Sequence, residues 1–233
     1  CGKTSWIYQQ IASKEKACPK SLQKILYLKA GTGKVHIDRK RISVDFPTVQ
    51  VFGDAQEAEF LTELESADIA YIELGNNLGL GYIDQLLNDL PYYPIAILPP
   101  GCKRCRWHSW AKEVLTGAAM KASLEGVETF RIETTGKVIG GDDLNEFWNQ
   151  IICNTYGKVI RAKGIFHLED GNIIYADFVD GVPCIDFLDL SLSRYLHGEP
   201  KCFSGLEIVG CSLNQDALGG IIEKIYVAKF SVL

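Results

Sequence analysis

The first residues of the chain have the types and the order of a phosphate-binding loop. Cys1-Gly2-Lys3-Thr4-Ser5 corresponds to the end of the pattern G-x-x-x-x-G-K-[ST], in which backbone N–H groups at a helix start cradle phosphates. In that pattern the lysine reaches the β- and γ-phosphates, and the next hydroxyl holds Mg²⁺. Gly2, Lys3, Thr4 and Ser5 are therefore the candidate nucleotide-binding residues. The alternatives are a capped helix start with a solvated lysine and a vestigial loop that keeps only the fold.

The segments that follow the loop are those that such a motif requires. Residues 6–11 have the pattern of an amphipathic helix start, and residues 24–28 predict an apolar strand. The first glycine of the pattern and the strand before it would precede Cys1. We therefore expect the natural chain to begin upstream of Cys1.

Two carboxylates are candidates to complete a phosphoryl-transfer site with Lys3 and Thr4. Glu73 ends a predicted apolar strand, and the carboxyl end of a parallel strand faces the ligand crevice of an open α/β sheet. Asp38 follows a loop-rich stretch. Either side chain could complete the magnesium site or orient an attacking water. The candidate catalytic residues are thus Lys3, Asp38 and Glu73, and the candidate Mg²⁺ ligands are Thr4 and Glu73. The alternative for each carboxylate is an ordinary solvated side chain.

A separate cluster has the spacing of metal ligands. Cys102, Cys105 and His108 would suit a tetrahedral zinc site that lacks one ligand, which another segment or a partner would supply. Interleaved basic residues would lower the thiol pKa values, which favours metal binding or redox chemistry. These basic residues are Lys103, Arg104 and Arg106. The alternatives are ordinary loop thiols and, with Trp107 and Trp110, a basic aromatic surface for docking a protein.

The composition limits the class of protein. Of the 233 residues, 47% are hydrophobic and 23% are charged, and the net charge of -5 argues against binding to nucleic acid or to anionic membranes. The longest apolar runs, such as residues 95–98, are far shorter than the roughly 20 residues of a transmembrane helix. The eight cysteines are irregularly scattered, so we expect free thiols in a reducing compartment, either the cytoplasm or an organelle stroma.

The order of the expected elements predicts two domains. Helices and strands alternate up to about residue 155, which is typical of a mainly parallel sheet. The strands are expected at 24–28, 48–52, 68–73, 93–98 and 127–132, and helices at 56–64, 82–90, 110–120 and 142–153. Beyond residue 157, short strands flank the turn at 169–172, which predicts an antiparallel hairpin. We therefore expect an α/β nucleotide-binding domain at 1–155 and a smaller α+β domain at 156–233.

Several of these segments together resemble the CobW-like family of P-loop GTPases and metallochaperones. In the N-terminal part, Gly2-Lys3-Thr4-Ser5 resembles the family's phosphate loop. Residues 33–38 resemble its G-E-V-x-I-D stretch, and residues 67–73 resemble its strand with a metal-side glutamate. The C-terminal segments are residues 159–166, similar to V-x-R-A-K-G-x-F, and residues 207–213, similar to V-x-x-G-x-x-L. The resemblance spans nearly the whole chain.

The chain also departs from the family at two motifs. Gly53-Asp54-Ala55-Gln56-Glu57 stands where family members carry G-C-x-C-C. No N-K-x-D element for guanine recognition is present, and the strand that would carry it ends in Leu98-Pro99-Pro100-Gly101. The resemblance is therefore to a divergent member without these two motifs.

The resemblance implies a P-loop NTPase with a mainly parallel sheet and with GTP and Mg²⁺ as cofactors. It implies slow GTP hydrolysis, because no arginine finger is evident, and use of that hydrolysis to gate metal delivery to, or assembly of, a metalloprotein client. Zinc is an additional candidate cofactor at Cys102, Cys105 and His108. The alternatives are a non-catalytic scaffold subunit of a larger complex that keeps a degenerate loop, and a zinc-dependent sensor.

Overall fold

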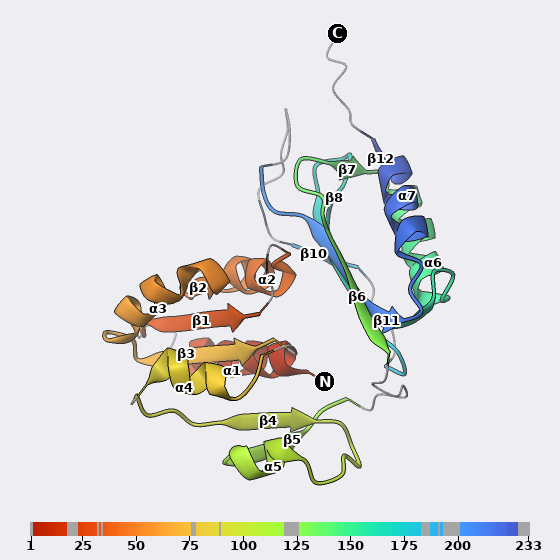
Figure 1. Ribbon diagram of the computed structural model, residues 1–233. Coiled ribbons are helices and arrows are strands. Elements are labelled where there is room, and N and C mark those ends of the chain that lie inside the picture. Colours follow the sequence, from red (N-terminus) through yellow and green to blue (C-terminus); the bar gives the residue numbers. More distant parts are fainter. Residues whose placement is uncertain are drawn as a thin grey trace. The chain divides into compact units, whose positions relative to one another are not determined.

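The computed structural model describes most of the chain as two compact units. The described residues are 2–17, 23–31, 33, 35–75, 78–88, 90–118, 126–182, 187–190, 192 and 201–227. The first unit comprises Cys1–Gly33 and Phe46–Met120, and the second comprises Lys34–Asp45 and Lys121–Leu233. Each unit has a sheet of its own (Figure 1). Among the described residues, none of the helices combines the length and the apolar character that a bilayer crossing demands.

The first unit is built on a parallel sheet, which confirms the prediction of a mixed α/β fold with parallel strands. Its three strands lie in the order β2-β1-β3, and both pairings are parallel. The strands are β1 (Ile25–Ala30), β2 (Gln50–Gly53) and β3 (Ile69–Leu74). Figure 1 shows β1 and β3 running in the same direction. All six residues of β1 are buried, as expected for a central strand.

Helices cover both faces of this sheet. On one face, α3 (Glu57–Leu64) and α4 (Gly81–Leu87) pack with Leu26 and Leu28 of β1 in one apolar cluster. A short 3-10 helix, η1 (Asp54–Gln56), precedes α3. Because side chains alternate along a strand, Tyr27 and Lys29 point to the other face. That face is covered by α1 (Lys3–Ala17), whose Thr4 contacts both Lys29 and Glu73.

The remainder of the first unit differs from the prediction. The predicted strand 93–98 is found as β4 (Ile95–Leu98), but β4 pairs in parallel with β5 (Glu113–Thr116) in a separate two-stranded sheet. The predicted helix over 110–120 is wrong, because α5 (Arg106–Trp110) ends where Ala111 turns to extended backbone. Pairing with β4 then holds Glu113–Thr116 as a strand. Residues 119 and 120 lie outside the described residues.

The second unit contains a five-stranded sheet in the order β10-β9-β8-β11-β6, in which every pairing is antiparallel. The strands are β6 (Val127–Glu133), β8 (Lys158–His167), β9 (Ile173–Val179), β10 (Leu188–Asp189) and β11 (Gly205–Cys211). β8 and β9 flank the turn at 169–172, which confirms the predicted hairpin. A short ribbon joins β7 (Val138–Ile139) to β12 (Tyr226–Val227).

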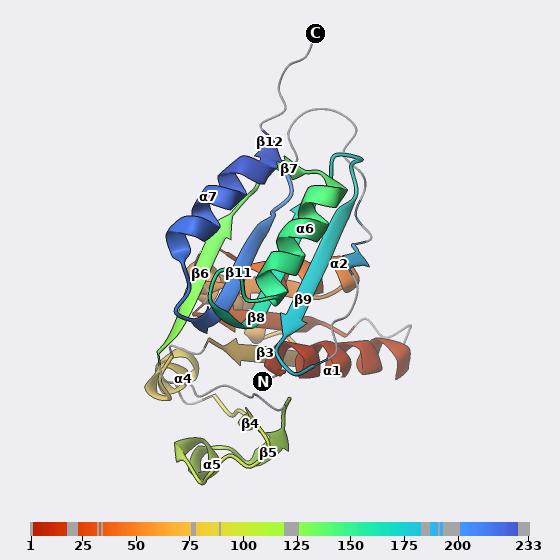
Figure 2. The same cartoon turned by 90° about the vertical axis from the view of Figure 1, so that its right-hand side faces the viewer.

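Helices also cover both faces of the second sheet. Figure 2 shows α6 (Gly141–Ile152) and α7 (Gln215–Ile225) side by side on one face. Their apolar side chains share a core with Ala162 and Phe166 of β8. On the other face α2 (Ile37–Asp45) packs Ile37 against Ile165 and Tyr175. The second unit thus takes one of its helices from the first fifth of the chain.

The division of the chain differs from the expected boundary near residue 155. The strand at Val127–Glu133 pairs with β11 rather than with the parallel sheet, and α6 packs on the same antiparallel sheet. Both elements therefore belong to the second unit, and the division falls between Met120 and Lys121.

Candidate phosphate-binding site

The site begins at the N-terminus of α1, where Lys3 is the first helical residue. Gly2 has a positive φ of 92°, which favours glycine, and its carbonyl accepts the first helical hydrogen bond from the Trp6 amide at 2.9 Å. No acidic residue stands in the first turn. The positive end of the helix dipole and the Lys3 ammonium therefore both favour an anion at this position. Ser5 is exposed on the same turn.

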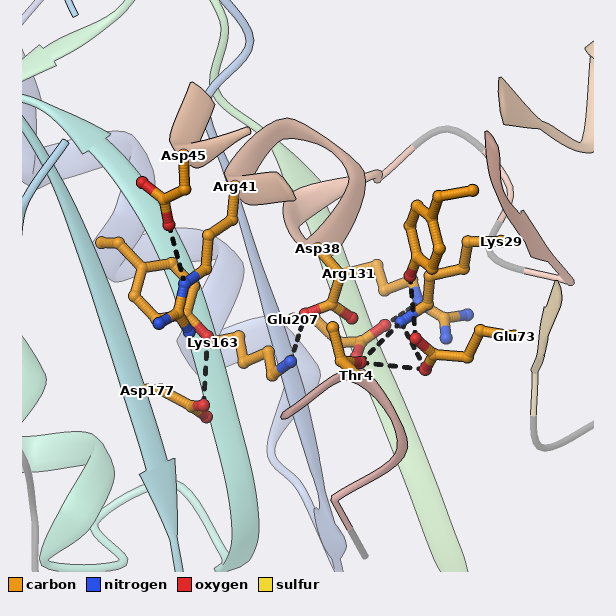
Figure 3. Close-up of polar contacts among 12 residues, drawn as sticks. Thr4, Lys29, Asp38, Arg41, Asp45, Glu73, Arg131, Lys163, Asp177 and Glu207 are labelled. Atoms are coloured by element: carbon orange, nitrogen blue, oxygen red, sulfur yellow. Dashed lines mark hydrogen bonds and ion pairs between the residues drawn. The ribbon is translucent and has the colours of Figure 1, made fainter. Parts of the chain in front are cut away.

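Glu73, at the carboxyl end of β3, is the centre of a group of buried polar contacts in the first unit (Figure 3). Its Oε1 accepts a hydrogen bond from Thr4 Oγ1 at 2.9 Å and pairs with Lys29 Nζ at 3.0 Å. Its Oε2 accepts a hydrogen bond from Tyr27 Oη at 2.8 Å. Lys29 Nζ also lies 3.4 Å from Thr4 Oγ1. The carboxylate thus has partners on both oxygens.

Strand pairing explains why these side chains meet. In the parallel register of β1 and β3, Lys29 stands directly opposite Glu73. Tyr27 precedes Lys29 by two residues and so points to the same face. The side chains are buried, with Lys29 at 8% exposure and Glu73 at 4%. An ion pair at this depth requires that each charge be matched, because an unpaired buried charge is costly.

Lys3 is also attached to the end of β3. Its Nζ donates a hydrogen bond to the carbonyl oxygen of Leu74 at 2.6 Å. The lysine of the sequence motif therefore contacts Leu74, and the threonine contacts the preceding residue, Glu73, at the carboxyl edge of the parallel sheet. The structure brings together three of the predicted site residues, namely Lys3, Thr4 and Glu73.

The loops at this edge are held by backbone contacts. The Gly75 amide donates to the Ala30 carbonyl at 2.7 Å, so the chain segments after β1 and β3 approach closely. The Asp54 carboxylate accepts hydrogen bonds from the amides of Gly31 at 2.5 Å and Gly33 at 2.8 Å. These bonds fix the loop that follows β1 next to η1.

Asp38 has a different environment from the other predicted catalytic residues. It lies in α2 of the second unit, is 6% exposed, and forms an ion pair with Lys163 of β8. Burial lowers the pKa of Arg161, but Asp38 first and Asp177 second outweigh it and raise that pKa. The Asp38 carboxylate is therefore engaged by cations of its own unit. Lys163, two residues from Arg161, is buried on β8, an inner strand of the sheet.

The predicted zinc ligands do not gather into a metal site. Cys105 Sγ lies 3.3 Å from His108 Nδ1, and the Cys105 amide donates to the same nitrogen at 3.1 Å. Cys102 Sγ instead donates to the Lys103 carbonyl at 3.4 Å. Loss of solvation first, and the neighbouring Cys105 second, raise the pKa of the Cys102 thiol, opposite to the predicted lowering by basic residues. In the part of the chain that the structure describes, no three His, Cys, Asp or Glu side chains are grouped to hold a metal ion.

Magnesium does not fit the contacts of Thr4 and Glu73. Mg²⁺ takes oxygen ligands at about 2.0–2.1 Å in a nearly octahedral arrangement and usually keeps several waters. Here the threonine hydroxyl donates directly to the carboxylate, and the Lys29 ammonium contacts both groups. A cation of the protein itself already neutralises Glu73.

Tyr27 and Lys29 were not anticipated from the sequence. The available signal was the lysine itself, since β1 has the sequence Ile-Leu-Tyr-Leu-Lys-Ala and is otherwise apolar or aromatic. A lysine inside a buried central strand requires a buried counterion. The identity of that counterion depends on strand register, which the sequence pattern alone does not give.

No protein-family model matches the chain. A comparison with curated proteins gives no match either. Among solved structures, the chain is similar to the Zn(II)-bound YjiA GTPase from E. coli, with 11% identity and a TM-score of 0.35 over 97% of this chain and 95% of that one. A Zn(II)-bound triple mutant of YjiA gives the same identity and TM-score over 87% and 90%. Both are zinc-bound GTPases. The likeness is distant, so the functional proposal rests on the contacts of Lys3, Thr4 and Glu73.

Proposed function

We propose that the first unit binds the phosphate groups of a nucleotide at the N-terminus of α1. The observation that carries this proposal is the buried hydrogen bond from Thr4 Oγ1 to Glu73 Oε1 at 2.9 Å. It joins the hydroxyl of the phosphate-loop motif to an acidic residue at the carboxyl end of a parallel strand. Ligands bind at that edge in open α/β sheets.

Lys3 and the helix start would provide the contacts to phosphate. The first amides of a helix have no intrahelical partner, and they point toward an anion placed beyond the N-terminus. Lys3 Nζ now donates to the neutral Leu74 carbonyl. A phosphate oxygen would offer it a charge-assisted hydrogen bond, which is roughly twice as strong as a neutral one.

The resemblance to the CobW-like family extends the proposal beyond phosphate binding. It supports GTP as the nucleotide and a metalloprotein client whose metal loading or assembly the bound nucleotide would gate. The five described cysteines that are free thiols agree with a reducing compartment such as the cytoplasm or an organelle stroma.

A second candidate is a scaffold subunit that has kept the fold without the ligand. One observation favours it: Lys3, Thr4 and Glu73 are all hydrogen-bonded within the protein, so their positions do not depend on a nucleotide. In that case the two units would serve to assemble a larger complex.

Nucleotide titration distinguishes the two candidates. Fluorescent GTP and ATP are titrated into the wild-type protein and into its Lys3→Ala variant. We expect the variant to bind at least tenfold more weakly, a loss of about 1.4 kcal/mol. Lys14→Ala, which removes an exposed lysine from the last turn of the same helix, is the control and should bind as the wild type does.

Equal affinity of the wild-type protein and Lys3→Ala would overturn the proposal. Absence of binding by the wild-type protein to either nucleotide would leave the scaffold as the function to test. Circular dichroism spectra of both variants are compared with that of the wild type to check that the total helix content is unchanged.

A further inference from the structure

We propose that the ammonium group of Lys29 takes the place of Mg²⁺ in this site, so that the protein binds a nucleoside phosphate without a divalent cation. This inference rests on the proposed nucleotide binding and adds to it the way in which the site is neutralised. It concerns one residue, on β1, that the phosphate-loop motif does not include.

The position of Lys29 carries the first part of the inference. Its Nζ lies 3.0 Å from Glu73 Oε1 and 3.4 Å from Thr4 Oγ1. Thr4 carries the hydroxyl that the sequence motif assigns to the metal, and Glu73 is the strand-end carboxylate predicted to complete the metal site. A cation therefore already contacts both groups, and it is covalently part of the chain.

The bonding capacity of Glu73 carries the second part. Oε1 accepts from Thr4 and from Lys29, and Oε2 accepts from Tyr27. Binding Mg²⁺ at Glu73 would require these bonds to break and the ammonium to move away. A buried ion pair whose partner is displaced leaves an uncompensated charge, which is strongly unfavourable.

Charge balance points in the same direction. Lys29 and Glu73 together are neutral and both are buried. A dication added beside them would leave two positive charges with no matching carboxylate from this pair. The neutral pair instead leaves Lys3 and the helix N-terminus to attract the phosphates.

The choice of lysine at this position is not explained by stability alone. Replacing a buried ion pair with apolar residues of similar size is often neutral or stabilising. The other residues that point from β1 into the unit are apolar or aromatic, so an apolar residue would fit the strand pattern. A role of the ammonium charge in ligand binding at this edge would explain why a lysine stands beside Thr4.

The use of an ammonium group in place of Mg²⁺ has a chemical consequence. An ammonium group supplies one positive charge and three N–H donors, but it is not a Lewis acid and does not generate a metal-bound nucleophile. The site therefore binds the nucleotide, and Mg²⁺ does not promote hydrolysis of that nucleotide.

The test compares nucleotide affinity in excess Mg²⁺ with that in excess EDTA. Fluorescent GTP and ATP are titrated into the wild-type protein in each buffer. We expect the two dissociation constants to agree within about threefold. Affinity that falls tenfold or more in EDTA would overturn the inference about Lys29 while leaving the proposed nucleotide binding intact. Absence of binding in both buffers would overturn the proposed function and, with it, this inference.

Lys29→Met tests the role of the ammonium directly. This variant keeps an unbranched side chain of nearly the same length and removes the cation paired with Glu73. We expect it to bind at least tenfold more weakly than the wild type in EDTA and to recover affinity in Mg²⁺. Lys24→Met, which removes a partly exposed lysine paired with Glu63, is the control and should behave as the wild type in both buffers. Unchanged affinity of Lys29→Met in EDTA would refute the inference.

A second variant covers the case in which Lys29→Met does not fold. The double variant Lys29→Met/Glu73→Gln removes both charges of the pair, so no buried charge is left unmatched. We expect it to bind more weakly than the wild type and to show no effect of Mg²⁺. Stimulation of its binding by Mg²⁺ would mean that other residues hold the metal, and the inference would be wrong.

Discussion

Glu73 joins three side chains of the first unit. It accepts from Thr4, pairs with Lys29 and accepts from Tyr27, and it is 4% exposed. It therefore connects the helix start, the central strand and the edge of the candidate site. Its charge is required because Lys29 is buried beside it, whatever ligand the site binds.

The first prediction concerns that charge. Glu73→Gln keeps the size of the side chain but leaves the Lys29 ammonium without its counterion. Because an unpaired buried charge is costly, we expect the free energy of unfolding to fall by about 3 kcal/mol or more. The measurement is urea denaturation followed by tryptophan fluorescence.

The control for Glu73→Gln is a carboxylate in an exposed ion pair of the same unit. Glu63 lies 2.6 Å from Lys24 Nζ, and both side chains are partly exposed. Glu63→Gln should cost less than about 1 kcal/mol. If the two variants lose equal stability, Lys29 does not depend on Glu73 for its charge balance.

At this scale the sequence indicates the chemistry but not the pairing. Lys3, Thr4 and Glu73 can be selected from one short motif and one strand end. Lys29 cannot be joined to Glu73 in the same way, because their contact depends on the register of β1 against β3. The sequence shows Asp38 only as a carboxylate after a loop-rich stretch, and its ion pair with Lys163 joins residues 125 positions apart.

The connection between β3 and the following loop depends on one glycine. A Cβ on Gly75 would lie 2.8 Å from the carbonyl oxygens of both Ala30 and Gly31. These are backbone atoms, so they cannot move aside as a flexible side chain can. The close approach of the segments after β1 and β3, next to the Lys29–Glu73 pair, therefore requires glycine here.

The second prediction follows for Gly75→Ala. The methyl group must push the two segments apart, so we expect the free energy of unfolding to fall by about 1–3 kcal/mol. We also expect weaker nucleotide binding, because the Lys29–Glu73 pair lies at the same edge. Urea denaturation and nucleotide titration measure the two effects.

Gly79→Ala is the matched control in the same segment. A Cβ there meets no atom within 4 Å, so the change should stay within about 0.5 kcal/mol. If Gly75→Ala and Gly79→Ala have the same free energy of unfolding, the segments after β1 and β3 separate easily.

The helices and strands that the sequence predicts correctly are those with a clear apolar run or turn signal. β1, β3 and the hairpin of β8 and β9 follow from apolar runs and a turn signal. The prediction of a helix over 110–120 is wrong, because the short segment Glu113–Thr116 forms a strand by pairing with β4. Short apolar segments carry too little periodicity to distinguish helix from strand.

At the scale of the whole chain, the second unit is discontinuous. Residues 34–45 join residues 121–233, although the entire parallel sheet after β1 lies between them in sequence. The alternation of elements predicts the parallel sheet but not this arrangement. The reason is that α2 is assigned to its unit by contacts distant in sequence, such as Ile37 with Ile165 and Asp38 with Lys163.

The third prediction is that α2 is needed for the second unit to be stable. The fragment 121–233 would expose the apolar face that Ile37 covers and would leave Lys163 without Asp38, a loss of about 3–5 kcal/mol from the ion pair alone. A fusion in which residues 34–45 precede 121–233 through a flexible linker restores both contacts. We therefore expect the fusion to unfold at a distinctly higher urea concentration than the fragment. Fluorescence of Trp148, which is buried between α6 and the sheet, follows the transition. The fusion carrying Asp38→Asn should fall between the two, because it keeps the apolar contact and loses the charge. A fragment as stable as the fusion would show that α2 is an accessory helix and that the second unit begins after residue 120.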